Sequence, residues 1–254
     1  MSDVVLTERR GGVLVITLNR PEAKNAVNAA LAQGVAAALD ELDSDVELNA
    51  GVITGAGGSF CAGMDLKAFV SGEFPYVEGR GFAGIAERSA DKPIIAAIEG
   101  YALAGGLEVA LSCDLLVAST ESKFGVPEVK RSLVAAAGAL IRLPKRIPYH
   151  VAMELALTGD FITAQRAYEL GLVNRLADAG GSLDVALELA EAIAKNGPLA
   201  LIASKKIVKS THDWTEAEAW DQQREIVQPV FGSEDATEGA TAFAEKRPPV
   251  WKGR

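Results

Sequence analysis

Short apolar stretches, each followed by a turn, recur through the first half of the chain and limit its fold more than any other feature. Residues 13–18, 50–54, 94–98 and 114–118 are mostly apolar and rich in valine, isoleucine, leucine and alanine, and we expect a strand at each. Because these stretches do not alternate with polar residues, they predict largely parallel strands buried on both faces. Hydrophobic side chains recur at helical spacing over residues 31–42. This half is therefore predicted to be α/β.

Helical patterns dominate the second half, and the strand signal fades after about residue 135. We expect helices at residues 163–170, 183–195, 198–210, 213–231 and 235–247. Asn196-Gly197 is a break between two of them. The chain is therefore divided into an α/β core over residues 1–195 and a helical C-terminal region over residues 196–254.

The composition of the 254 residues excludes several classes of function. A net charge of −9 disfavours nucleic-acid binding, which needs a basic surface, so a polyanionic ligand would require a local basic patch. No apolar run reaches the roughly 18 residues of a membrane span. The polar N-terminus lacks the apolar segment of a signal peptide.

The cysteines and histidines are few. With only Cys61 and Cys113, we expect buried, reduced thiols and a cytoplasmic protein. Two dispersed histidines and two cysteines give no transition-metal signature, so no metal is expected.

Two glutamates lie twenty residues apart beside glycine- or proline-marked turns. Glu108 ends the segment AGGLE, in a helix expected to begin near Gly105, and Glu128 ends the segment FGVPE. Taken singly, each has a structural interpretation: Glu108 would support the helix dipole or lie on an exposed face, and Glu128 follows a proline at a helix start. Together with nearby open turns, the pair is typical of acid–base chemistry next to a carbonyl group.

The glycine turns at Gly63-Met64 and Ala104-Gly105 expose backbone N–H groups. Two such groups aimed at one oxygen form an oxyanion hole. At Gly105, the absence of a side chain leaves room for an approaching carbonyl, and the helix N-terminus adds its positive dipole end.

The segment TGAGG at residues 54–58 offers a different interpretation, a dinucleotide-binding loop. Such a loop should open directly into a helix and is usually found at the first strand of its domain. Here a second glycine turn follows, and the loop comes after the second expected strand. The dinucleotide interpretation is therefore disfavoured.

A series of motifs runs from about residue 13 to residue 247. They are residues 19–26 (NRPEAKNA), 60–67 (FCAGMDLK), 100–108 (GYALAGGLE), 113–114 (CD), 124–128 (FGVPE), 157–160 (LTGD), 171–173 (GLV) and 243–247 (FAEKR). In this order they resemble the enoyl-CoA hydratase/isomerase (crotonase) superfamily. The resemblance implies a ClpP/crotonase-like α/β spiral of ββα units, followed by a C-terminal α-helical trimerisation region. Trimers commonly pair into hexamers in this superfamily.

The resemblance also implies roles for residues. The backbone N–H groups of Met64 and Gly105 would bind a thioester oxygen, and Glu108 and Glu128 would be the catalytic pair. The coenzyme A groove would be lined by Ala23, Lys24, Ala26, Ala62, Asp65, Leu66 and Lys67. Lys67 and Lys246 would contact phosphates, the latter from a neighbouring subunit.

The implied reaction is the reversible addition of water to a trans-2-enoyl-CoA, without a cofactor beyond the coenzyme A of the substrate. A second interpretation is a carnitinyl-CoA dehydratase-like enzyme, which residues 81–84 (GFAG) and 142–144 (RLP) resemble. The same scaffold also hosts isomerases. A third interpretation is a non-catalytic acyl-CoA-binding protein. The acyl chain, its length and the pathway stay open at this point.

Three departures from the superfamily pattern concern the surroundings of the expected site. Residues 133–139 (LVAAAGA) replace a more glycine-rich run that borders the acyl pocket, which leaves the preferred chain length open. Glu99 replaces an amide residue, and Ala104 replaces the first glycine of a triplet. We expect both substitutions to touch the surroundings of the site without removing a catalytic group.

Overall fold

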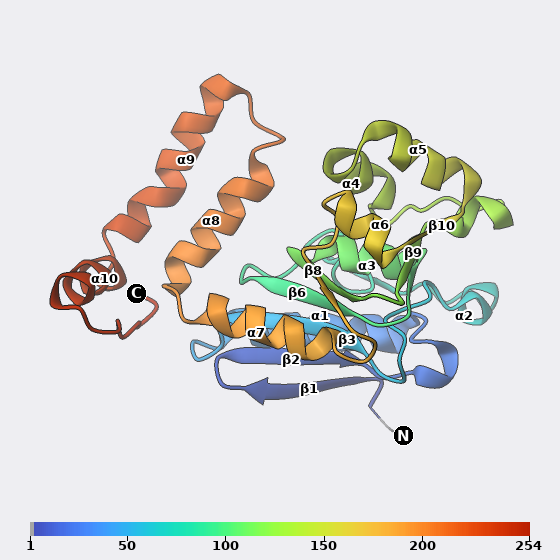
Figure 1. The fold of residues 1–254 in the computed structure, drawn as a ribbon, viewed down its shortest axis with the longest axis horizontal. Coiled ribbons are helices and arrows are strands. Elements are labelled where there is room, and N and C mark those ends of the chain that lie inside the picture. The colour runs from blue at the N-terminus through green and yellow to red at the C-terminus, as the bar shows by residue number, and fades with distance from the viewer. Residues whose placement is uncertain (1–2) are drawn as a thin grey trace.

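A six-stranded sheet lies at the centre of the computed structural model, which describes residues 3–254 (Figure 1). Its strands, in spatial order, are β1 (Val5–Arg10), β2 (Val13–Leu18), β3 (Ala50–Gly55), β6 (Ile94–Ile98), β8 (Leu115–Ser119) and β11 (Arg175–Ala177). β1 runs antiparallel to β2, and every other neighbouring pair is parallel. The largely parallel α/β core predicted from the sequence is confirmed.

Both faces of this sheet are covered by helices, which explains why its inner strands are apolar throughout. Side chains of a strand point alternately to the two faces. In β2, Val13 and Val15 pack with α7 (Ser182–Ala194), while Leu14, Ile16 and Leu18 belong to the larger cluster on the other face. That cluster includes side chains of α1 (Ala29–Ser44) and α3 (Gly105–Ser112).

A repeated unit connects the main sheet to a second, three-stranded sheet made of β7 (Tyr101–Leu103), β9 (Lys123–Gly125) and β10 (Phe161–Thr163). β6 turns into β7 and then α3, and β8 turns into β9 and then the 3₁₀ helix η2 (Pro127–Arg131). After β3, Cys61 bridges to Ala102 of β7, and α2 (Leu66–Val70) follows. The predicted spiral of ββα units is thus present. Because β3, β6 and β8 are parallel, their three turns meet at one edge of the sheet.

The remaining elements of the core are short. They are the 3₁₀ helix η1 (Pro21–Ala23), the hairpin of β4 (Tyr76–Val77) and β5 (Gly81–Phe82), α4 (Ala139–Arg146), α5 (Tyr149–Thr158) and α6 (Ala164–Glu169). Among residues 3–254, no helix combines the length and the apolar character that crossing a membrane requires.

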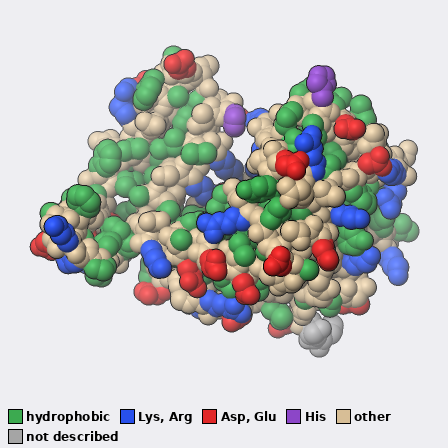
Figure 2. Space-filling view, viewed as in Figure 1, with side chains coloured by type: hydrophobic (Ala, Val, Ile, Leu, Met, Phe, Trp, Pro, Cys, Tyr) green, Lys and Arg blue, Asp and Glu red, His purple; other side chains and the backbone are tan. Residues whose placement is uncertain are grey.

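The C-terminal region consists of α8 (Pro198–Ser210), α9 (Glu216–Phe231) and α10 (Glu234–Glu245). α8 and α9 form an antiparallel pair that stands off the core in Figure 1. Hydrophobic side chains gather along this pair in Figure 2, and Val208, Trp220 and Phe231 are between 61% and 79% exposed. The predicted boundary at residue 195 falls between α7 and α8, and the division into two domains stays a prediction.

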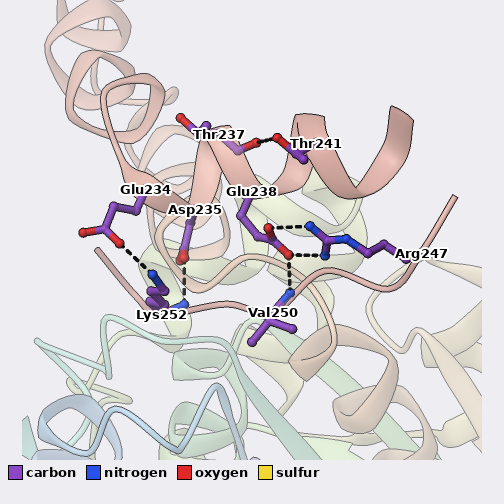
Figure 3. A pocket seen from close by; sticks show the side chains of 8 residues that line it. All are labelled: Glu234, Asp235, Thr237, Glu238, Thr241, Arg247, Val250 and Lys252. Atoms are coloured by element: carbon purple, nitrogen blue, oxygen red, sulfur yellow. Dashed lines mark hydrogen bonds and ion pairs between the residues drawn. The ribbon is translucent and has the colours of Figure 1, made fainter. Parts of the chain in front are cut away.

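The chain end is held against α10. Asp235 accepts hydrogen bonds from the backbone N–H groups of Lys252 (2.7 Å) and Gly253 (2.9 Å), as Figure 3 illustrates for Lys252. Glu238 forms a two-armed ion pair with Arg247 in the same hollow (Figure 3). These contacts hold the residues that follow α10 against this helix.

The predicted elements and the observed ones differ in places. Two strands, β10 and β11, lie beyond residue 135, where the strand signal of the sequence fades. Each has only three residues and depends on pairing with a neighbour, so the local sequence carries little strand signal. β1 was also not predicted, because it is a largely exposed edge strand with polar residues. α4 and α5 were missed too, and α4 contains Pro144, which disfavours a helix in sequence-based prediction.

Replacing Asn25 by alanine is expected to destabilise the fold. Its side chain is fully buried; it donates to the carbonyls of Ala56 (2.9 Å) and Ser59 (2.6 Å) and accepts from the N–H of Arg20 (2.8 Å). Each buried polar group left without a partner costs about 1–3 kcal/mol. The residue also has a φ of 55°, which asparagine tolerates better than alanine.

We expect Asn25→Ala to lower the free energy of unfolding by about 3 kcal/mol, measured by urea denaturation at a fixed protein concentration. Asn196→Ala is the matched control, because Asn196 is exposed, and its effect should stay within about 0.5 kcal/mol. Equal unfolding midpoints for the two variants would contradict the structural role of Asn25.

Candidate functional site

The first part of the site is the turn from β7 into α3. Ala104, at the N-cap, has φ 51° and ψ −129°, a conformation that favours glycine. Glycine is required at the next two positions by close approach. A Cβ on Gly105 would lie 2.6 Å from the Phe82 ring, and one on Gly106 would lie 2.0 Å from the carbonyl oxygen of Cys61. The N–H of Gly105 is in the first turn of α3, where it has no partner within the helix.

The second part is the turn at Gly63, which has a φ of 109°. The residues on either side of its neighbour Met64 both hydrogen-bond to Val27. The N–H of Val27 donates to the carbonyl of Gly63 (2.8 Å), and the carbonyl of Val27 accepts from the N–H of Asp65 (2.9 Å). Across the described residues, the N–H of Met64 donates to no other group of the chain. The backbone nitrogen of Met64 lies 3.5 Å from the position that a Cβ on Gly105 would occupy. The structure thus brings together the two N–H groups that the sequence singled out.

Glu108 lies in the first turn of α3 and is 3% exposed. Its Oε1 accepts hydrogen bonds from the backbone N–H groups of Ala137 (2.7 Å) and Ala139 (3.1 Å). Burial raises the pKa of the carboxyl, and the two N–H donors and the charge of Arg142 oppose that rise. The segment 133–139 is therefore in direct contact with one of the two predicted catalytic groups.

Glu128 follows Pro127 in the first turn of η2. Its Oε2 is buried and has no hydrogen-bond partner within residues 3–254. Burial, together with the charge of Glu108, raises the pKa of Glu128 to about 7. The two carboxyl groups therefore lie close enough for the charge of Glu108 to influence Glu128. Glu128 holds a proton more readily than an ordinary glutamate does. A buried pair with one raised pKa near neutrality can both accept and donate a proton.

The segments predicted to line a coenzyme A groove lie side by side. The N–H of Ala62 donates to the carbonyl of Lys24 (3.0 Å), and Ala26 and Ala23 lie in the same turn. Lys24 Nζ lies 5.0 Å from the centroid of the Tyr101 ring, a cation–π arrangement.

Asp65, in the second of these segments, has a structural role in the free chain. It accepts from the N–H groups of Lys67 (3.1 Å) and Ala68 (3.3 Å), which caps α2. It also pairs with Arg20 at 2.9 Å, a contact that lowers the pKa of the carboxyl. Arg20 belongs to the motif at residues 19–26, but sequence reasoning gave it no role. Leu66 begins α2 and is partly exposed.

The two lysines expected to contact phosphates are far apart. Lys67 lies on α2, and Lys246 is the exposed C-cap residue of α10. α2 and α10 lie toward opposite ends of the molecule in Figure 1. A single chain therefore does not bring Lys246 to the groove, and its expected role across a subunit boundary stays a prediction.

The structure revises the expectation for Glu99. Its carboxylate accepts from the backbone N–H groups of Gly180 (3.1 Å) and Ser182 (3.0 Å) and so supports the start of α7. α7 covers the face of the sheet opposite α3, so this side chain points away from α3, whereas the backbone carbonyl of Glu99 accepts from the N–H of Phe60 (2.8 Å) at the start of the segment 60–67. Sequence reasoning also missed Phe82, whose ring packs against Gly105, because no local pattern connects the two.

Known proteins resemble this chain over its whole length. The family model described as "Enoyl-CoA hydratase/isomerase" matches residues 8–254. The enoyl-CoA hydratase EchA19 of Mycobacterium tuberculosis is 43% identical, with 98% of this chain and 96% of the relative covered. Carnitinyl-CoA dehydratase of Proteus mirabilis is 42% identical over the full length of both. A crystal structure of an enoyl-CoA hydratase from Mycobacterium tuberculosis superposes with a TM-score of 0.97, at 58% identity and complete coverage of both chains.

The raised pKa of Glu128 predicts a pH-dependent stability difference. The folded-state value of about 7 is above the ordinary value of 4.5, so the folded protein binds a proton that the unfolded chain gives up in this window. Wild type therefore loses stability from this group as pH rises from about 4.5 to about 7. Glu128→Gln has no such loss, so its stability relative to wild type should rise by about 1–3 kcal/mol across the window.

Urea denaturation of both proteins at a series of pH values measures this difference. Glu191→Gln, which changes an exposed glutamate on α7, should show a constant difference from wild type. A difference between Glu128→Gln and wild type that does not change with pH would show that Glu128 titrates normally.

Proposed function

The chain belongs to the enoyl-CoA hydratase/isomerase family, and on that premise we propose that it adds water reversibly to trans-2-enoyl-CoA thioesters to give 3-hydroxyacyl-CoA. The observation that carries this proposal is the coupled carboxyl pair of Glu108 and Glu128, one of which has a pKa of about 7. Hydration of an enoyl thioester needs one group to take a proton from water and another to supply one. Glu108 and Glu128 can divide these tasks.

The two N–H groups of Met64 and Gly105 would bind the thioester oxygen. When water adds to the β carbon, negative charge develops on that oxygen, as in an enolate. Preorganised N–H donors stabilise such charge, and loss of one donor typically costs about 10²–10³ in rate. The N-terminus of α3 adds its positive dipole end at the same place.

The proton transfers follow from the environments of the two carboxyl groups. Glu108, held by two N–H donors, would be ionised and take a proton from the attacking water, whose oxygen bonds to the β carbon. Glu128, which holds a proton more readily, would donate it to the α carbon. Both groups would act from one face of the substrate, which gives syn addition. Because the two carboxyl groups are coupled, their protons titrate as a property of the pair.

The rest of the substrate would occupy the groove between residues 23–26 and residues 62–67. Backbone groups there would bind the coenzyme A moiety, and Lys67 would contact a phosphate. The reaction as proposed uses no cofactor, and we propose a cytoplasmic location.

The exposed hydrophobic side chains along α8 and α9 support assembly into a homotrimer or a homohexamer. In such an assembly, Lys246 of one subunit would reach the groove of its neighbour. Size-exclusion chromatography with light scattering should give a mass of three or six chains. A monomer at micromolar concentration would exclude this role for Lys246.

A second candidate is the dehydration of a carnitinyl-CoA-like substrate. It is favoured by the 42% identity to the carnitinyl-CoA dehydratase of Proteus mirabilis. The same two glutamates would act, so a panel of acyl-CoA substrates distinguishes the candidates. A non-catalytic acyl-CoA-binding protein would have no use for a coupled, buried carboxyl pair, because burying two such groups costs free energy.

Glu128→Gln should abolish most of the activity. Removing a positioned acid costs about 10²–10⁴ in rate, and the amide preserves size. The measurement is the loss of the enoyl-thioester absorbance with crotonyl-CoA and longer enoyl-CoAs, with Glu191→Gln as the control that retains activity. If wild type and Glu128→Gln are equally slow on every enoyl-CoA, the hydratase proposal fails.

A further inference from the structure

A half-buried guanidinium lies behind the segment that holds Glu108. Arg142, on α4, directs Nη1 to the hydroxyl of Ser112 (3.2 Å) and to the carbonyl of Ala137 (3.3 Å). Its Nη2 donates to the carbonyl of Ala86. One side chain thus joins α3, the segment 133–139 and the segment that follows β5.

Gly138 makes room for this guanidinium. The residue has a φ of 112°, and a Cβ there would lie 2.2 Å from Arg142 Nη1. An amino acid with a Cβ would be strained in this backbone conformation and would also crowd the guanidinium. Gly138, the glycine of this otherwise alanine-rich segment, therefore leaves free the space that the guanidinium of Arg142 occupies.

Arg142 is connected to Glu108 by two short paths. Ala137 accepts from Arg142 through its carbonyl and donates through its N–H to Glu108 Oε1 (2.7 Å). Ser112 accepts from Arg142 and donates its hydroxyl proton to the backbone carbonyl of Glu108 (2.7 Å). The guanidinium therefore holds both the loop that binds the carboxylate and the helical turn that carries it.

We propose that Arg142, placed by Gly138, is a positioning residue that holds the N–H groups of the segment 133–139 on the carboxylate of Glu108. The geometric part of this proposal stands on the contacts above. Its consequence for catalysis rests on the proposed hydratase function, in which Glu108 takes the proton of water.

The charges around Glu108 support this role. Glu128 on η2 is a second carboxyl group, and Tyr76 on β4, hydrogen-bonded to Glu87, is near enough for its pKa to be raised by the charge of Glu108. Burial favours the neutral form of Glu108, and the backbone N–H groups of Ala139 and Ala137 oppose it. Among the described residues, Arg142 on α4 is the cation whose charge lowers the pKa of this group.

Arg142→Gln tests the proposal in the free protein. Carbon-13 NMR of the glutamate carboxyls, assigned with Glu108→Gln, follows the titration of Glu108 without substrate. Because the charge of Arg142 and the two N–H groups that it holds in place all oppose the rise that burial imposes, loss of Arg142 should raise the pKa of Glu108 further. The acid limb of the kcat/KM profile for hydration should move to higher pH by the same amount. A merely structural role would lower the plateau without moving this limb.

Two further variants separate charge from geometry. Arg142→Lys keeps the charge and should restore part of the titration, while its single ammonium cannot make all three contacts. Gly138→Ala keeps Arg142 but displaces Nη1, and should shift the titration in the same direction as Arg142→Gln. Arg146→Gln is the matched control, one turn along α4, with no hydrogen bond to the segment 133–139 among the described residues.

The outcomes distinguish this proposal from the proposed function. If Glu108 titrates alike in wild type, Arg142→Gln and Gly138→Ala, the role of Arg142 is excluded, whatever the activity. If the titration shifts but wild type hydrates no enoyl-CoA, the positioning role stands and the hydratase function fails. If thermal melting shows that Arg142→Gln does not fold, Gly138→Ala and Arg142→Lys decide, since an unshifted titration in both would overturn the proposal.

Discussion

The close approach of α3 to the turn at Gly63 is the contact on which the rest of the site depends. Gly106 allows the first turn of the helix to touch the carbonyl of Cys61, where a Cβ would lie only 2.0 Å from the oxygen. The approach places the N–H groups of Met64 and Gly105 together and sets the start of the helix that carries Glu108. It is possible because successive ββα units turn at the same edge of a parallel sheet. The order of strands thus creates the geometry that the chemistry requires.

Burial of two carboxyl groups is the energetic cost of this arrangement. The fold meets it differently at each group: Glu108 receives two backbone N–H donors and the charge of Arg142, whereas Glu128 has an oxygen without a partner. Two identical side chains therefore differ in proton affinity because of their surroundings. In the proposed reaction, this asymmetry, rather than the presence of two glutamates alone, gives the pair a direction for proton transfer.

The sequence predicted what local patterns encode. The strands at residues 13–18 and 94–98 and the helix at residues 198–210 are found with these bounds, because apolar runs and proline or glycine boundaries define them. The three-residue strand β11 was not predictable, since it depends on pairing with β8. In the site, Gly105 and Glu108 were identified from motifs, whereas the contact of Arg142 with Ala86 joins residues 56 positions apart. Such contacts arise from tertiary packing and leave no periodic signal.

Ala104 shows how the fold tolerates strain at the site. Its φ of 51° favours glycine, and residues in such conformations persist only where their surroundings hold them. The N–H of Ala104 donates to Gly125 (2.9 Å), three residues before Glu128, and its carbonyl accepts from the N–H of Glu108 (3.2 Å). The strained residue therefore ties together the two segments that carry the carboxyl pair. The same turn presents the N–H of Gly105. The hydrogen bonds that hold Ala104 in its strained conformation therefore also fix this N–H group relative to the two carboxyl groups.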